Sequence, residues 1–308
     1  MYSPKTLYKT FKLFVNEIIF NLNRKVTSYF LEKAFFIMLY LIGLGLGEPD
    51  DITVKGLNIV KSADAVYLEA YTSILSCGKE GLEKFYGREI IVADREHVEQ
   101  NCDDFLIPAK TKNIAFLVVG DPFGATTHSD LVLRAVEMGI PYKVVHNASI
   151  MNAVGCCGLQ LYHFGETVSI VFWNENWKPQ SFLDKIESNL RNGLHTLCLL
   201  DIKVKEQTVE NMIKRNKIFE PPRYLTVSKA AAQLLEIVEE RQSDNKECLL
   251  NESTMCVGLG RVGCDDQMIK AAPLNKMVDC DMGKPLHSMI VCGKMHDLEL
   301  DFLKQYSV

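Results

Sequence analysis

The sequence predicts an α/β protein of two domains, with a mostly parallel sheet in the first and a mixed sheet in the second. In the first half, short apolar segments alternate with amphipathic helical segments, which is typical of a parallel sheet covered by helices. Residues 114–119 are apolar without a break, as expected of a strand buried on both faces. The length of 308 residues suits two domains of ordinary size.

The elements of the first domain follow in order from Met38. Strands are predicted from apolar and β-branched runs at 38–42, 65–68, 90–93, 114–119 and 142–145. Helices are predicted from 3.6-residue periodicity and capping signals at 53–60, 78–86, 96–105 and 130–138. For the last of these, Thr126 or Thr127 is the predicted cap. We place this domain at residues 38–148.

The second domain is predicted at residues 149–308. Its strands are expected at 167–173, 196–201, 255–259 and 288–291. Its helices are expected at 149–159, 181–191, 208–214, 226–241 and 298–303. Helices and strands alternate less regularly here than in the first half, which favours a mixed sheet.

Residues 1–37 differ from the rest of the chain, because they hold six basic and two acidic residues with many aromatics between them. A mitochondrial presequence is one interpretation, although serine and arginine are scarce. We expect an N-terminal extension outside the fold, since the first buried strand begins at Met38.

Composition narrows the function classes. The chain is 47% hydrophobic and 24% charged, as in a soluble globular protein, and its longest apolar stretch is too short to span a membrane. A formal charge of −5 argues against a nucleic-acid partner. The ten cysteines form no C-x-x-C pair and have no histidines at zinc-ligand spacing, so reduced thiols in the cytoplasm and no metal are expected.

Two glycine-rich turns follow predicted strands. The first, with Gly43, Gly45 and Gly47, lacks the last glycine of the dinucleotide fingerprint because residue 48 is Glu48. The second reads G-D-P-F-G, from Gly120 to Gly124, at the carboxyl end of the 114–119 strand. Ligands of α/β sheets bind at such places, although a plain strand-ending turn is the alternative.

Within the second turn, Gly124 would let the backbone approach a ligand, and Asp121 would supply a carboxylate. The loop after Glu69, A-Y-T-S-I-L-S-C-G, is polar and aromatic and suits a pocket wall.

Four motifs together resemble the tetrapyrrole methylase superfamily: G-L-G-L-G-E-P-D-D-I-T, G-D-P-F-G-A-T-T-H-S-D-L, H-N-A-S-I-M-N-A-V-G and G-R-V-G-C-D-D-Q. The resemblance covers residues 38–308. Within the superfamily, the sequence is most similar to the diphthine synthase branch. The superfamily's first loop commonly reads G-x-G-P-G-D, and Leu46 and Glu48 replace its Pro and Asp here, which favours that branch over tetrapyrrole chemistry.

The resemblance implies S-adenosylmethionine bound between two α/β domains of a protein methyltransferase. The implied substrate is translation elongation factor 2, bearing a histidine extended with a 3-amino-3-carboxypropyl group. Eukaryotic members of the branch add three methyl groups to the amine and one to the carboxylate, giving diphthine methyl ester. A homodimer with no nucleic acid or membrane partner is the implied assembly.

The motif positions that match the family imply the cofactor-binding residues Leu46, Asp121, Gly124, Ser149, Ile150, Leu200, Val262 and His287. Taken without the resemblance, Leu200 is a core residue and His287 a surface histidine. No residue stands out as a catalytic base, and Glu69 is a candidate contact for the cationic substrate. Two alternatives stay open: a tetrapyrrole methyltransferase of the same superfamily, and a non-catalytic scaffold that binds elongation factor 2.

Overall fold

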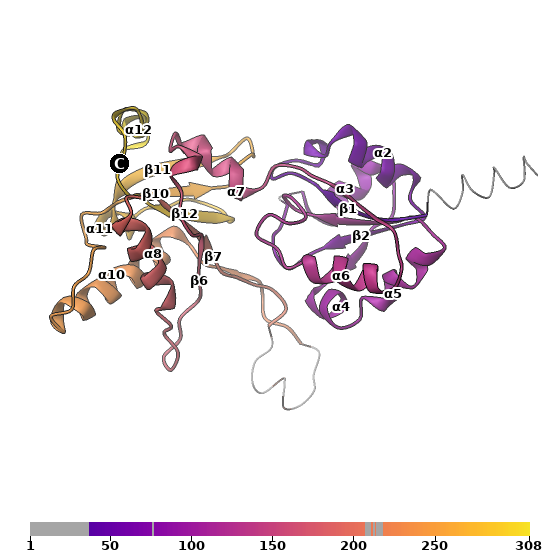
Figure 1. Ribbon diagram of the computed structural model, residues 1–308, viewed down its shortest axis with the longest axis horizontal. Helices are drawn as coiled ribbons and strands as arrows, with labels where there is room; N and C mark the ends of the chain where they lie inside the picture. Colours follow the sequence, from indigo (N-terminus) through magenta and orange to yellow (C-terminus); the bar gives the residue numbers. More distant parts are fainter. Residues whose placement is uncertain (1–36, 76, 207–210, 212, 214–217) are drawn as a thin grey trace, which may run out of the picture.

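The computed structural model describes residues 37–308, except residues 76, 207–210, 212 and 214–217. Two five-stranded sheets lie side by side, each flanked by helices (Figure 1). The predicted fold class is confirmed, with a parallel sheet in the first domain and a mixed sheet in the second. The predicted helix at 208–214 falls largely outside the described residues.

The first sheet has the strand order β3-β2-β4-β1-β5, and all its pairings are parallel. Every residue of β4 is buried, as the continuous apolar run predicted. The strands are β1 (Leu39–Gly43), β2 (Ala65–Glu69), β3 (Ile91–Ala93), β4 (Ile114–Val118) and β5 (Tyr142–Val145).

The helices of the first domain are α2 (Val54–Ser62), α3 (Gly78–Tyr86), α4 (Arg95–Glu99), α5 (Asp103–Leu106) and α6 (Ser129–Glu137), with short 3-10 turns at Pro49–Asp51 and Pro108–Lys110. Thr53 caps α2, since its hydroxyl accepts from the Gly56 N–H at 3.0 Å. The single helix predicted at 96–105 is wrong. The structure has α4 and α5 there, because the chain leaves the helix at residues 100–102.

The predicted capping of α6 is also wrong. The residue before the first turn is His128, and no side chain caps the helix. Thr126 instead donates its hydroxyl proton to the Pro122 carbonyl at 2.5 Å, which closes the loop upstream of the helix.

The second sheet has the order β11-β10-β12-β7-β6, in which only β6 and β7 pair in parallel. Its strands are β6 (Val168–Ile170), β7 (Thr196–Leu200), β10 (Met255–Gly260), β11 (Met268–Pro273) and β12 (His287–Val291). A separate ribbon pairs β8 (Ile202–Lys203) with β9 (Arg223–Tyr224). The strand β11 and this ribbon were not predicted, and β6 is shorter than the predicted 167–173.

The helices of the second domain are α7 (Ile150–Ala153), α8 (Ser181–Arg191), α10 (Val227–Ser243), α11 (Leu274–Met277) and α12 (Asp297–Leu303). The helix predicted at 149–159 is α only in its first turn. A 3-10 turn, Val154–Cys157, continues it and ends at Gly158, whose φ of 92° is left-handed. Further 3-10 turns are η4 (Leu161–His163) and Lys304–Tyr306.

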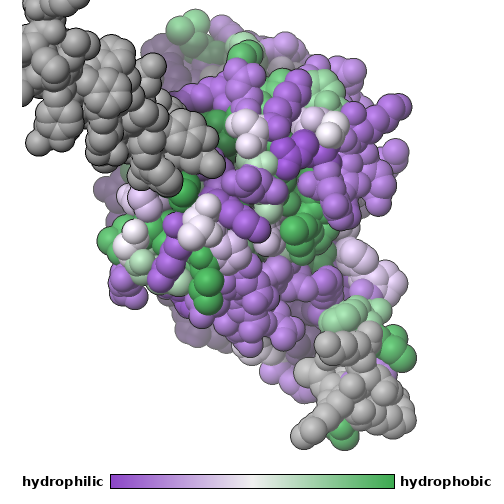
Figure 2. All heavy atoms as spheres, turned by 90° about the vertical axis from the view of Figure 1, so that its right-hand side faces the viewer, coloured by the Kyte–Doolittle hydropathy of each residue, from purple (hydrophilic) through white to green (hydrophobic). Residues whose placement is uncertain are grey.

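The surface at the first-domain end of the molecule is mostly hydrophilic, with hydrophobic residues in small separate groups (Figure 2). Among the residues that the structure describes, no helix combines the length and apolar character needed to cross a membrane.

Candidate functional site

A pocket lies between the two domains, at the carboxyl ends of the parallel strands of the first sheet. Loops after β1, β2, β4 and β5 form one wall, and residues of β7, β12 and the loop after β10 form the other. Seven of the eight predicted cofactor residues line it: Leu46, Gly124, Ser149, Ile150, Leu200, Val262 and His287.

The loops after β1 and β4 are joined by backbone hydrogen bonds. The Gly120 N–H donates to the Gly45 carbonyl at 2.7 Å, and the Gly45 N–H donates to the Gly120 carbonyl at 3.3 Å. Both glycines have φ near 80°, in the left-handed region that favours glycine. The two glycine-rich turns of the sequence are therefore a single paired structure at the pocket floor.

Gly124 lies against Ser149, where the chain enters the second domain. A Cβ atom at position 124 would lie 2.4 Å from Ser149 Oγ, closer than any real contact. The Ser149 hydroxyl accepts from the Met151 N–H at 3.2 Å and caps α7. The missing side chain at position 124 therefore leaves room for Ser149. It affects a ligand only indirectly, through the position of the Ser149 side chain.

Asp121 is not among the described residues that line the pocket. Its carboxylate accepts hydrogen bonds from Phe123 N at 2.9 Å, Asn147 N at 3.1 Å and His146 Nδ1 at 2.8 Å. Burial alone would raise the pKa of Asp121, but these hydrogen bonds lower it below the usual value. In this geometry the carboxylate ties the β4 loop to the β5 loop, which agrees with the turn interpretation of the motif.

His287 brings an unpaired polar atom to the second-domain wall. Its Nε2 donates to the Lys284 carbonyl at 2.9 Å, whereas its Nδ1 is buried without a hydrogen-bond partner. Burial lowers the pKa of His287, so the ring is neutral at pH 7 and Nδ1 is an acceptor. A ligand N–H group would satisfy it.

Arg261 organises the loop that carries Val262. Its guanidinium donates to the carbonyls of Met282 at 2.7 Å and Lys284 at 2.5 Å, and to Asp266 Oδ2 at 2.8 Å. Because these bonds engage most of its donors, Arg261 shapes the pocket wall rather than offering a free positive charge.

The loop after β2 lines the pocket with Thr72, Ser73 and Ile74, as its polar composition suggested. Glu69 itself is 1% exposed and lies beneath this loop. Sequence reasoning missed Thr126, Cys264 and Ser288 on the pocket walls. No local signal marks these three, because only the packing of the two domains brings them to one cavity.

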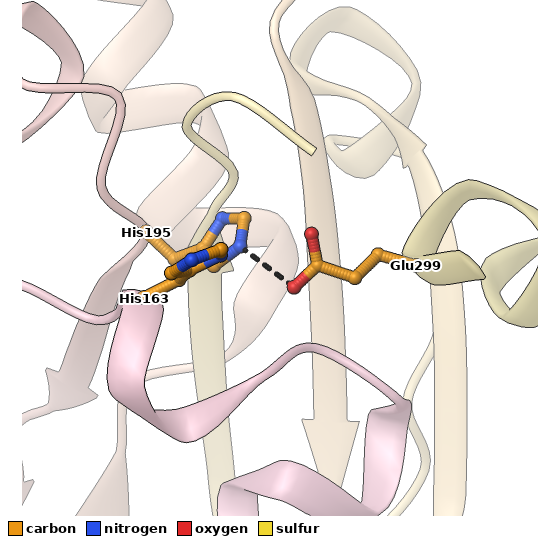
Figure 3. Close-up of side chains that lie close together, drawn as sticks. All are labelled: His163, His195 and Glu299. Carbon is orange, nitrogen blue, oxygen red and sulfur yellow. Dashed lines mark hydrogen bonds and ion pairs between the residues drawn. The ribbon is translucent and has the colours of Figure 1, made fainter. Parts of the chain in front are cut away.

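His163, His195 and Glu299 form a cluster outside the pocket (Figure 3). The Gly293 N–H donates to His195 Nδ1 at 3.0 Å, so the ring proton lies on Nε2, which donates to Glu299 Oε1 at 3.3 Å. With its proton there, Nε2 has no lone pair for a cation. Glu299 also accepts from the Gln160 N–H at 2.8 Å and the His296 N–H at 2.7 Å. These hydrogen bonds therefore hold α12 against the sheet. They explain the contact between His195 and Glu299 without a bound metal ion.

Comparison with known proteins places the fold in a family. The model of the family "Tetrapyrrole (Corrin/Porphyrin) Methylases" matches residues 38–274, well over half of the chain. The chain belongs to the tetrapyrrole methylase family. Within this family, diphthine methyl ester synthase of Homo sapiens is 63% identical over 272 residues, covering 88% of this chain and 95% of its own. The Dictyostelium discoideum protein of the same name is 54% identical over 274 residues, covering 88% of this chain and 99% of its own.

Solved structures agree with this placement. A crystal structure of diphthine synthase has a TM-score of 0.73 and 33% identity, over 88% of this chain and 96% of that one. The predicted membership in the diphthine branch of the tetrapyrrole methylase family is confirmed, and with it a methyltransferase activity in diphthamide biosynthesis. The cofactor roles of the eight predicted residues stay predictions.

Proposed function

We propose that the chain uses S-adenosylmethionine to methylate the 3-amino-3-carboxypropyl group of a modified histidine on elongation factor 2. Three methyl groups go to the amine and one to the carboxylate, which gives diphthine methyl ester. The observation that supports this most strongly is the 63% identity to the Homo sapiens diphthine methyl ester synthase over 272 residues.

The chemistry of the pocket suits this cofactor. Leu46, Ile150, Leu200 and Val262 give apolar walls for adenine and the methionine chain. The unpaired Nδ1 of His287 is a buried acceptor, which suits an amino group of the cofactor. The Ser149 hydroxyl is held in place as a helix cap and lines the same cavity. When bound, the cofactor supplies a methyl group activated on a sulfonium.

The residues of the chain would act mainly by alignment. Methyl transfer from a sulfonium is an in-line displacement whose leaving group belongs to the cofactor, so holding both reactants in line is the main requirement. The paired glycine turns are held by backbone hydrogen bonds, and the loop around Arg261 is held by hydrogen bonds that its guanidinium donates to main-chain carbonyls, which fixes both pocket walls in place. A cavity between two domains would also limit the access of water to the reacting groups.

The same proposal includes a homodimer in the cytoplasm. Large apolar side chains on α12 support an assembly, since Leu298 is 67% and Phe302 43% exposed. Sedimentation equilibrium tests it, and a monomer at micromolar concentration would contradict it.

The deciding experiment is methyl transfer to elongation factor 2 purified from cells that lack this protein. Mass spectrometry is expected to show four added methyl groups when the cofactor is present. Calorimetric titration with S-adenosylmethionine runs in parallel. Cofactor binding without transfer to the factor would favour a tetrapyrrole methyltransferase, whereas absence of cofactor binding would favour the scaffold.

A further inference from the structure

Thr72 differs from the other hydroxyl-bearing residues of the pocket. Its hydroxyl donates a hydrogen bond to a carboxylate, with Thr72 Oγ1 2.7 Å from Glu69 Oε2, and no other hydroxyl among the described lining residues is seen to do so. A carboxylate only accepts hydrogen bonds, so the proton of Thr72 points toward Glu69. The hydroxyl oxygen can therefore offer only lone pairs to the pocket, and it suits a donor such as an ammonium group.

Glu69 is held rigidly behind that hydroxyl at the end of β2. Its Oε1 accepts from the Tyr71 N–H at 2.7 Å and the Thr72 N–H at 2.6 Å, and the side chain is 1% exposed. Because Thr72 lines the cavity, its hydroxyl links the Glu69 carboxylate to the cavity. We call Thr72 and Glu69 the relay pair.

The surroundings of Glu69 change the basicity of its carboxylate. Burial raises the pKa of Glu69, which makes its carboxylate a better proton acceptor than an exposed one. The hydrogen bonds from the loop and the charge of Arg95 on α4 act in the opposite direction and offset part of this rise in the pKa of Glu69. Tyr71, the other titratable side chain beside it, stays neutral because burial raises its pKa to about 12.

The titratable side chains that line the pocket among the described residues are Arg261, Cys264 and His287. Arg261 carries a permanent charge that is already hydrogen-bonded. Burial lowers the pKa of His287 and raises that of the Cys264 thiol, so the first is a weak base and the second stays protonated. Unlike these three side chains, Glu69 accepts a hydrogen bond from a hydroxyl that lines the cavity.

We propose that the relay pair takes the proton that the substrate amine must lose before each N-methylation. The inference rests on the proposed function, which supplies the amine. An N–H bond of the ammonium breaks and its proton passes to Thr72 Oγ1, while the proton of Thr72 passes to Glu69 Oε2. The freed lone pair of the nitrogen forms the N–C bond as the S–C bond breaks, with its electron pair staying on sulfur. Glu69 then returns its proton through Thr72 to solvent.

The two kinds of methylation separate a relay from a structural role. Amine methylation requires loss of a proton, whereas a carboxylate is methylated in its ionised form. Thr72→Val is therefore tested on two forms of elongation factor 2, one with the unmethylated amine and one already carrying three N-methyl groups. We expect amine methylation to slow about 10²-fold at pH 7 and to recover as the pH rises, with ester formation unchanged. Calorimetry should show wild-type affinity for S-adenosylmethionine.

Thr111→Val is the matched control. It removes an exposed hydroxyl outside the pocket that donates to a main-chain carbonyl and not to a carboxylate. Its pH profile should match the wild type, and Thr72→Ser should restore the amine reaction. Equal slowing of both reactions in Thr72→Val, or an unshifted pH profile, would overturn the relay. A wild-type protein that methylates neither form contradicts the proposed function itself, and that outcome is read from the wild type alone.

Discussion

At position 124 the chain has no room for a side chain, because Ser149 fills the space that a Cβ atom would need. An added methyl group would lie 2.6 Å from Ser149 Cβ as well as 2.4 Å from its Oγ. We predict that Gly124→Ala displaces Ser149 and weakens S-adenosylmethionine binding by about tenfold or more, equal to about 1.4 kcal/mol. Calorimetry on Gly124→Ala measures it. Wild-type affinity would show that the pocket tolerates the shift.

His128 gives a residue-scale prediction on pH. Both its ring nitrogens are buried without partners, and its ring packs edge-on against Tyr71 and Phe116. Burial lowers its pKa from 6.5 to about 4, so the unfolded chain takes up a proton at a pH where the folded chain does not. The neutral ring therefore contributes its full share of stability above pH 6.5, and this share is lost as the pH falls toward 4.

At about 1.4 kcal/mol per pH unit, the loss reaches roughly 2 kcal/mol by pH 5. His128→Phe keeps an aromatic ring of similar size and removes the titrating nitrogens. Urea unfolding at pH 7.5 and pH 5 should show a smaller acid loss in this variant. The same loss in both proteins would assign the acid sensitivity to other groups.

Among the elements, α12 depends on one buried carboxylate. Glu299 accepts from His195, from the Gln160 N–H and from the His296 N–H (Figure 3). Glu299→Ala leaves three donors without their partner, and each unsatisfied buried group costs about 1–3 kcal/mol. We predict a loss of at least about 2 kcal/mol of unfolding free energy with unchanged cofactor affinity. Asp301→Ala, on the exposed side of the same helix, is the control. An unchanged unfolding free energy in Glu299→Ala would show that α12 packs on the sheet without this carboxylate.

Asp121 joins two loops, and the prediction for it follows from that role. Asp121→Asn keeps one oxygen for Phe123 N but loses the charge that holds Asn147 N and His146. Because the hydrogen bonds depress the pKa of Asp121, its stabilisation is present above about pH 4 and is lost below it. We expect a lower thermal midpoint at pH 7 and a smaller acid loss than in the wild type. An unchanged midpoint with weakened cofactor binding would support the predicted ligand role of Asp121 instead.

Elements with a strong local pattern could be predicted from the sequence. The strand β4 is a pure apolar run, and Thr53 marks the start of α2 by its capping hydroxyl. The strand β11 could not be predicted from the sequence, because Lys270 and Pro273 interrupt its apolar pattern. Its position is set by pairing with β10. Likewise the pocket-lining Leu200 and His287 follow from the family motifs, whereas Thr72 became a candidate catalytic residue only through its contact with Glu69.

For the whole molecule, we predict that residues 38–308 fold and bind S-adenosylmethionine without residues 1–37. The strand β1 starts at Leu39 and is paired on both sides, with β4 and with β5. Soluble expression of this truncation, followed by calorimetry, tests the prediction. Aggregation or loss of binding would assign the N-terminal segment to the fold.

The two domains touch at a point where a glycine lies on each side, Gly47 in the first domain and Gly263 in the second. A Cβ atom at Gly47 would lie 2.3 Å from the Gly263 carbonyl oxygen, and one at Gly263 would lie 3.1 Å from Leu46 Cβ. At this point the separation of the sheets is set by backbone against backbone. Residues elsewhere on the pocket walls can therefore be substituted during evolution without altering the width of the cleft at this point. Substrate preference can then change while the spacing of the two domains stays the same.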